Sequence, residues 1–104
     1  MLPAFDCRER EISRIISIDL LDAGCLEFCC LGEEAENLHD ELDEIIEIKG
    51  LSSIITTWHD DIQDACEYFV NASGGGADCL VGLMEEHGLV VSELRREVRE
   101  MGLE

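Results

Sequence analysis

Three cysteines between residues 25 and 30 are the first candidates for chemistry in this chain. Cys25 and Cys29 are four residues apart and can share one face of a helix, and Cys30 follows directly. Thiolates bind zinc well, but structural zinc sites use Cys-x-x-Cys pairs, and the sequence contains none. We therefore expect no metal site and interpret the six cysteines as reduced thiols, most of them packing as small apolar side chains.

A second candidate is the segment Trp58-His59-Asp60-Asp61-Ile62-Gln63-Asp64. On a helix Asp60 and Asp64 are one turn apart, with His59 on a neighbouring strip. The segment lacks the Glu-x-x-His pairs that di-iron bundles supply from two helices. We interpret it as a polar surface beside a core tryptophan and predict no cofactor.

Other catalytic patterns are missing from the sequence. Glycines 74–76 are not followed by the Lys and Ser/Thr of a phosphate-binding loop, and no Gly-x-Ser-x-Gly motif occurs. We therefore predict no catalytic residues and no enzymatic activity.

The elements that position these residues are predicted to be helices, because apolar residues recur at spacings of three and four. In segment 26–49 they are Phe28, Leu31, Ala35, Leu38, Leu42 and Ile45, and in segment 51–72 they are Leu51, Ile55, Trp58, Ile62, Ala65 and Phe69. Further helices are expected over 6–24, which opens with the capping pattern Asp6-x-x-Glu9, and over 78–87 and 92–101. The prediction is a single all-α domain, 1–104: a compact bundle of four or five helices with a central antiparallel helical hairpin formed by 26–49 and 51–72.

The net charge of the chain comes from its middle. Residues 15–94 hold nineteen Asp and Glu and one base, Lys49, whereas the two ends hold six acids and six arginines. The formal charge is −18. A field of that sign repels nucleic acid and anionic lipid and attracts basic protein surfaces.

An acidic face is predicted on the helix that contains residues 33–47. Three like-charge pairs, such as Glu36 and Asp40, are four residues apart on it, and each costs about 0.2–0.5 kcal/mol. An ordinary surface helix interleaves lysine, and this one does not. We expect the face to bind a partner through eleven residues: Glu33, Glu34, Glu36, Asp40, Glu41, Asp43, Glu44, Glu47, Asp60, Asp61 and Asp64.

A surface of carboxylates can imitate the phosphates of a nucleic acid. The chain resembles phage anti-restriction and anti-CRISPR proteins and some antitoxins in size and charge, with no shared motif. This resemblance implies an acidic inhibitor or decoy that binds a basic surface of a nucleic-acid-binding enzyme or complex, without binding nucleic acid or membrane itself. The sequence has no secretory signal and no apolar stretch long enough to span a membrane, so we expect a cytoplasmic protein.

Three alternatives stay open at this point. The acidic face can be a solvated surface that serves only solubility. The apolar seams can pair with another helix, which would make the protein an adaptor or a homodimer. Residues 80–101, with Arg95, Arg96 and Arg99, have the outline of a helix-turn-helix, although a DNA reader of this net charge would repel its ligand. Arginines at this end can instead pair with the acidic helices.

Overall fold

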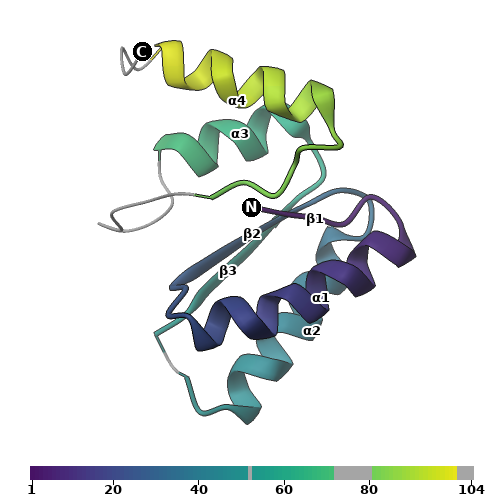
Figure 1. The fold of residues 1–104 in the computed structure, drawn as a ribbon, viewed down its shortest axis with the longest axis vertical. Coiled ribbons are helices and arrows are strands. Elements are labelled where there is room, and N and C mark those ends of the chain that lie inside the picture. Colours follow the sequence, from purple (N-terminus) through teal and green to yellow (C-terminus); the bar gives the residue numbers. More distant parts are fainter. Residues whose placement is uncertain (52, 72–80, 101–104) are drawn as a thin grey trace.

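The computed structural model is a three-layer α/β fold with a parallel sheet in its middle (Figure 1). It describes residues 1–51, 53–71 and 81–100. In chain order the elements are β1 (Leu2–Pro3), α1 (Cys7–Asp22), β2 (Glu27–Leu31), α2 (Ala35–Ile48), β3 (Ile55–His59), α3 (Ile62–Asn71) and α4 (Gly88–Glu100).

The sheet is built from two consecutive β-α-β units. Strand order is β1-β2-β3, and both pairings are parallel, with Leu2 opposite Cys30 and Leu31 opposite His59. Helices α1 and α2 pack together on one face, whereas α3 packs on the other face and carries α4 (Figure 1). Because the strands are parallel, their carboxyl ends and the N-termini of the following helices meet at the same end of the sheet.

The central strand β2 is buried on both faces. Successive side chains of a strand point to opposite sides. Phe28 and Cys30 therefore join Leu38 and Leu42 in the core beneath α1 and α2. On the other face Cys29 joins Cys66, Leu31, Phe69, Met84 and Val90 in the core beneath α3 and α4. These two apolar layers hold the three-layer arrangement together.

The all-α bundle and its central antiparallel helical hairpin are therefore wrong. Within segment 26–49 only Ala35–Ile48 is helical, and residues 27–31 are strand β2. Within segment 51–72 residues 55–59 are strand β3, and the helix begins at Ile62. Two parallel strands with a crossover helix bury the apolar residues that the hairpin would have paired.

The predicted helix over 78–87 is also wrong in the part that can be compared. Residues 81–87 are not helical. Residues 78–80, which include Cys79, lie outside the described residues, as do Gly74, Gly75, Gly76 and Met101. The last helix begins at Gly88 rather than at Ser92. Its inner side contributes Val90 to the core, with Val91 and Leu94 packed against it.

Helix α1 begins as predicted, but it packs differently. Asp6 Oδ1 accepts a hydrogen bond from the Glu9 nitrogen at 2.7 Å, and Glu9 Oε1 accepts one from the Phe5 nitrogen at 2.9 Å. The buried side of the helix carries Ser13 and Ser17. Ser13 donates to the Pro3 carbonyl at 2.6 Å. Small side chains allow α1 to approach the sheet closely, and the larger Ile12 and Ile15 are about half exposed.

Candidate functional site

Helix α2 presents most of the predicted acidic residues to solvent. Its core side is formed by Ala35, Leu38, Leu42 and Ile46, all buried. The acids between them lie on the remaining surface. Five of these are exposed, and together they form what we call the α2 stripe: Glu36, Asp40, Asp43, Glu44 and Glu47.

Two other acids of this region are used inside the protein. Glu34 Oε1 lies 2.5 Å from Arg10 Nη1, and Glu41 lies between Arg10 and Arg14, with distances of 3.0 and 3.5 Å to their Nε atoms. All four side chains are less than a third exposed. Glu34 and Glu41 therefore hold α2 against α1, and we remove them from the candidate binding residues.

Acidic residues also make contacts on the side of α2 that faces β3. Asp43 accepts a hydrogen bond from the Thr56 hydroxyl and lies 3.5 Å from His39 Nε2. Asp40 lies 3.2 Å from His39 Nδ1. Asp40 and Asp43 still have 71% and 52% of their side chains exposed, so both carboxylates remain accessible to a partner.

The remaining predicted acids gather where the strands end, and we call them the strand-end cluster: Glu33, Asp60, Asp61 and Asp64. The Gly32 nitrogen donates to the His59 carbonyl at 3.1 Å, which places the residues that follow β2 and β3 side by side. Asp61 Oδ1 accepts from the Asp64 nitrogen at 2.8 Å at the start of α3. All four residues of the cluster are exposed.

The carboxyl ends of the parallel strands are where open α/β folds bind their ligands, often a phosphate at a helix N-terminus. Here the protein's own carboxylates occupy the helix starts: Asp6 and Glu9 at α1, Glu33 and Glu34 before α2, and Asp61 at α3. Their charge opposes the approach of a phosphate. This end of the sheet therefore suits a cationic group rather than a nucleotide.

Among the described residues, the nine acids of the α2 stripe and the strand-end cluster have no Lys or Arg partner, and the basic side chain that contacts them there is His39. Like-charge neighbours at i, i+4 remain within α2, as in Glu36 with Asp40 and Asp40 with Glu44. Each such pair destabilises the helix by about 0.2–0.5 kcal/mol. The fold keeps these charges at the surface at a net cost.

The cysteines that suggested a metal site lie on different faces of the sheet. Cys29 belongs to the core under α3 and Cys30 to the core under α2. Burial raises the pKa of the Cys30 thiol to about 12 and that of the Cys66 thiol to about 11. Across residues 1–51, 53–71 and 81–100, no three His, Cys, Asp or Glu side chains come close enough together to hold a metal ion.

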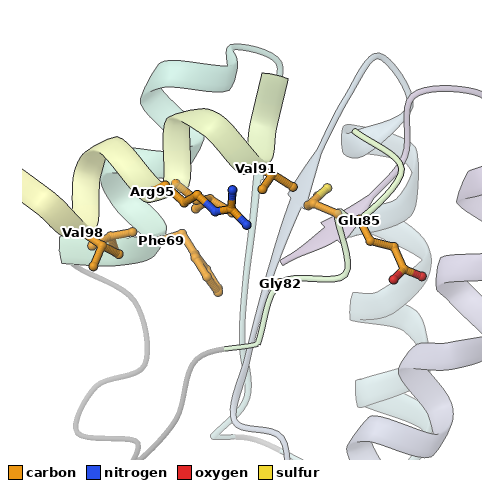
Figure 2. Close-up of a pocket in the computed structure, with 9 residues that line it drawn as sticks. Phe69, Gly82, Glu85, Val91, Arg95 and Val98 are labelled. Carbon is orange, nitrogen blue, oxygen red and sulfur yellow. The ribbon is translucent and has the colours of Figure 1, made fainter. Parts of the chain in front are cut away.

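A separate cavity of about 440 Å³ lies between α3, α4 and the segment around Gly82 (Figure 2). Its walls are mostly apolar, with Phe69, Val91 and Val98 among them. The two charged residues that line it, Glu85 and Arg95, are exposed. No acid of the α2 stripe or the strand-end cluster lines it, so the cavity does not belong to the acidic surface.

Sequence reasoning missed the exposed strand beside the stripe. The apolar spacing predicts an inward helix face for Trp58, yet this residue lies on β3 and is 42% exposed. The available signal was the run Ile54-Ile55-Thr56-Thr57-Trp58, because consecutive β-branched and aromatic residues favour strand over helix.

Comparison with curated proteins found no match. Comparison with solved structures also found none. None of the helices within the described ranges combines the length and the hydropathy that crossing a membrane requires. A family model described as a domain of unknown function, DUF7684, matches residues 5–84, which include α1, β2, α2, β3 and α3. The chain belongs to the DUF7684 family.

Proposed function

We propose that this protein is an acidic inhibitor or decoy that occupies the basic surface of a nucleic-acid-binding protein or complex, in the manner of an anti-restriction protein, an anti-CRISPR protein or an antitoxin. It acts by occupancy and carries out no chemistry. A cytoplasmic location is part of the proposal and rests on the cysteine-rich composition and the expected partner.

The observation that supports this proposal most directly is the α2 stripe. Glu41 and Glu34 have arginine partners on α1, whereas Glu36, Asp40 and Glu44 face solvent without one among the described residues. A face that served only solubility gains from interleaved lysines, which add favourable i, i+4 pairs. The stripe instead carries charge of one sign, as a phosphate imitation requires.

The features that suggested an adaptor or a helix-turn-helix are weaker in the structure than in the sequence. Leu38 and Leu42, the centre of the apolar seam, are fully buried against the sheet, which supports the inhibitor over an adaptor that pairs through this seam. Residues 81–87 provide no first helix for a helix-turn-helix. On α4, Arg96 bonds to Glu93, Glu97 and Glu100 of its own helix, which leaves less positive charge for DNA than the sequence suggested.

The test compares two triple variants with the same change in net charge. The stripe variant is Asp40→Asn, Glu44→Gln, Glu47→Gln, and the control is Asp19→Asn, Glu85→Gln, Glu86→Gln, all exposed residues outside the stripe. A partner is first isolated from the native host with the wild-type protein at low salt and eluted at high salt. Its displacement from DNA or RNA by each variant is then measured.

We expect the stripe variant to compete much more weakly, mainly through slower association at low ionic strength, because electrostatic steering depends on the local field. The control should compete nearly as well as wild type. Equal competition by both variants would mean that only the total charge matters, and the stripe would then be a solvated surface.

A further inference from the structure

The two edges of the sheet differ in how they are covered. Beside β1, the Met1 nitrogen donates to the Val81 carbonyl at 2.8 Å, and the Leu83 nitrogen donates to the Met1 carbonyl at 3.1 Å. The segment 81–83 therefore continues the sheet past β1. At the other edge, β3 is the last strand, and no described residue forms a backbone hydrogen bond to its outer side.

The register of β3 identifies which of its peptide groups point outward. The Ile55 nitrogen donates to the Leu26 carbonyl, and the His59 carbonyl accepts from the Gly32 nitrogen, both at 3.1 Å. These residues, and Thr57 between them, thus direct their peptide groups toward β2. Since the direction alternates along a strand, Thr56 and Trp58 direct their N–H and C=O groups away from the sheet.

The sequence of β3 itself lacks the devices that usually protect an edge strand. Proteins block open edges with lysine, proline, a bulge or a very short strand. The sequence of β3, Ile-Thr-Thr-Trp-His, is five residues long and has no lysine and no proline. Ile55 and Trp58 are 53% and 42% exposed. Since no described residue bonds to its outer side, the strand can pair with a further strand.

The surroundings of the edge are acidic. Asp43 is bonded to Thr56, which fixes α2 against β3. Trp58 lies two residues further along β3 than Thr56, a distance of about 6.6 Å. Helix α2 runs antiparallel to β3, so His39, four residues before Asp43, lies about 6 Å away in the same direction. Trp58 is therefore level with His39, whose ring lies beside Asp40 and Asp43. An exposed indole on a strand whose neighbouring helix presents Asp40 and Asp43 to solvent is suited to a lysine or arginine side chain.

We propose that β3 binds an extended, lysine- or arginine-bearing segment of the partner protein, which adds to the sheet as a further strand along Thr56 and Trp58. This inference rests on the proposed function, because it specifies the basic partner that the acidic surface receives. The formal charge of −18 disfavours a second copy of this chain at the same edge, since like charges brought together oppose association. Backbone pairing supplies affinity, and the carboxylates select the charge of the incoming side chains.

The probe is a synthetic seven-residue peptide of alternating arginine and valine, with a glutamate and valine peptide as the control. Trp58 is the only tryptophan, so its fluorescence reports directly on this edge. We expect the arginine peptide to change the fluorescence at low salt and the glutamate peptide to leave it unchanged. Hydrogen exchange should slow at the Thr56 and Trp58 amides, which point outward, and change less at Ile55 and Thr57.

A matched pair of variants isolates the outward N–H group. Thr56→Ala and Thr56→Pro both remove the hydroxyl that bonds to Asp43, but only the proline also removes the N–H, which makes no bond to β2. Thr56→Ala should bind the arginine peptide nearly as wild type does. Thr56→Pro should bind about tenfold more weakly, the effect of about one hydrogen bond. An arginine peptide methylated at alternate backbone nitrogens tests the same pairing without altering the protein.

Three outcomes would overturn the inference. If Thr56→Pro and the methylated peptide bind as well as their controls, and exchange slows only along α2, the edge is not used while the proposed function still stands. If the arginine peptide does not bind at low salt, both proposals fail. If the free protein forms a dimer that Thr56→Pro dissociates, the occupant of β3 is a second copy.

Discussion

Arg10 Nε on α1 lies 3.0 Å from Glu41 Oε1 on α2. This ion pair joins the locally neutral N-terminal segment to the acidic middle of the chain, so the separation of charge along the sequence is not kept in space. It also divides the acids of α2 into two sets. The acids on the α1 side stabilise the packing of α1 against α2, whereas the acids of the α2 stripe repel one another.

The two sets should respond oppositely to loss of charge. We expect Glu41→Gln to lower the free energy of unfolding by up to about 1 kcal/mol, because a partly buried pair with Arg10 is lost. Glu44→Gln should leave it unchanged or raise it by about 0.2–0.5 kcal/mol, because repulsion by Asp40 is relieved. Urea denaturation measures both. Equal destabilisation by the two variants would contradict this division.

The apolar side of α2 should dominate stability. Leu42 is fully buried between α2 and the sheet, so Leu42→Ala should cost about 2–5 kcal/mol. Ile62, at the start of α3, is only half-buried, and Ile62→Ala should cost less. Ile48→Ala serves as the control, because 78% of Ile48 is exposed, and its effect should stay within about 0.5 kcal/mol. If Ile48→Ala is as costly as Leu42→Ala, this face of α2 has been wrongly assigned.

Sequence reasoning located the helices better than the strands. The start of α1 at the Asp6 cap and the buried positions Leu38 and Leu42 of α2 follow from local patterns that the structure contains. The strand Glu27–Leu31 does not alternate between polar and apolar residues, because both of its faces are buried. Phe28, Leu31 and Ala35 therefore matched a helical spacing by coincidence, which a short apolar run permits.

The acidic surface could be predicted in part. Outward positions on α2 followed from its apolar spacing, which is why Glu36, Asp40 and Glu44 were placed at the surface. The arginine partners of Glu34 and Glu41 could not be predicted, because they depend on α1 packing beside α2. The open edge of β3 was missed for a similar reason, since an edge exists only once the strand order of the sheet is known.

The turn after β2 depends on a glycine that no other residue can replace without strain. Gly32 has a φ of +133°, and a Cβ there would collide with the carbonyl of Ala4. Gly24 also has a positive φ, +94°, but a Cβ there meets nothing within 4 Å. We expect Gly24→Ala to cost about 1–2 kcal/mol for the left-handed conformation alone. Gly32→Ala should cost clearly more, because the backbone at Ala4, directly after β1, must also move. Thermal unfolding of the two variants provides the measurement, and equal losses would show that the collision is relieved without cost.

The single tyrosine should titrate unusually late. The Tyr68 hydroxyl donates to Glu27 Oε2 at 2.7 Å, and this bond, together with burial and the nearby charge of Glu27, raises the pKa of Tyr68 to about 12 from its ordinary value of 10.0. A raised pKa in the folded state means that the folded protein holds the phenolic proton more tightly than the unfolded chain does. The stability from this group is complete below pH 10 and is lost as the pH rises from about 10 to about 12.

Tyrosinate absorbance reads this pKa without interference, because the chain has one tyrosine. In Glu27→Gln the amide oxygen can still accept the hydrogen bond, but the negative charge is gone, so the pKa of Tyr68 should fall back toward 10 and the alkaline loss of stability should begin closer to it. Glu67→Gln is the matched control, because Glu67 is exposed and contributes nothing to the shift of its neighbour. The two variants differ only in which carboxylate is neutralised. If Tyr68 in the wild-type protein titrates near 10, or if Glu27→Gln leaves a high pKa unchanged, the contact between α3 and the start of β2 is not the one described.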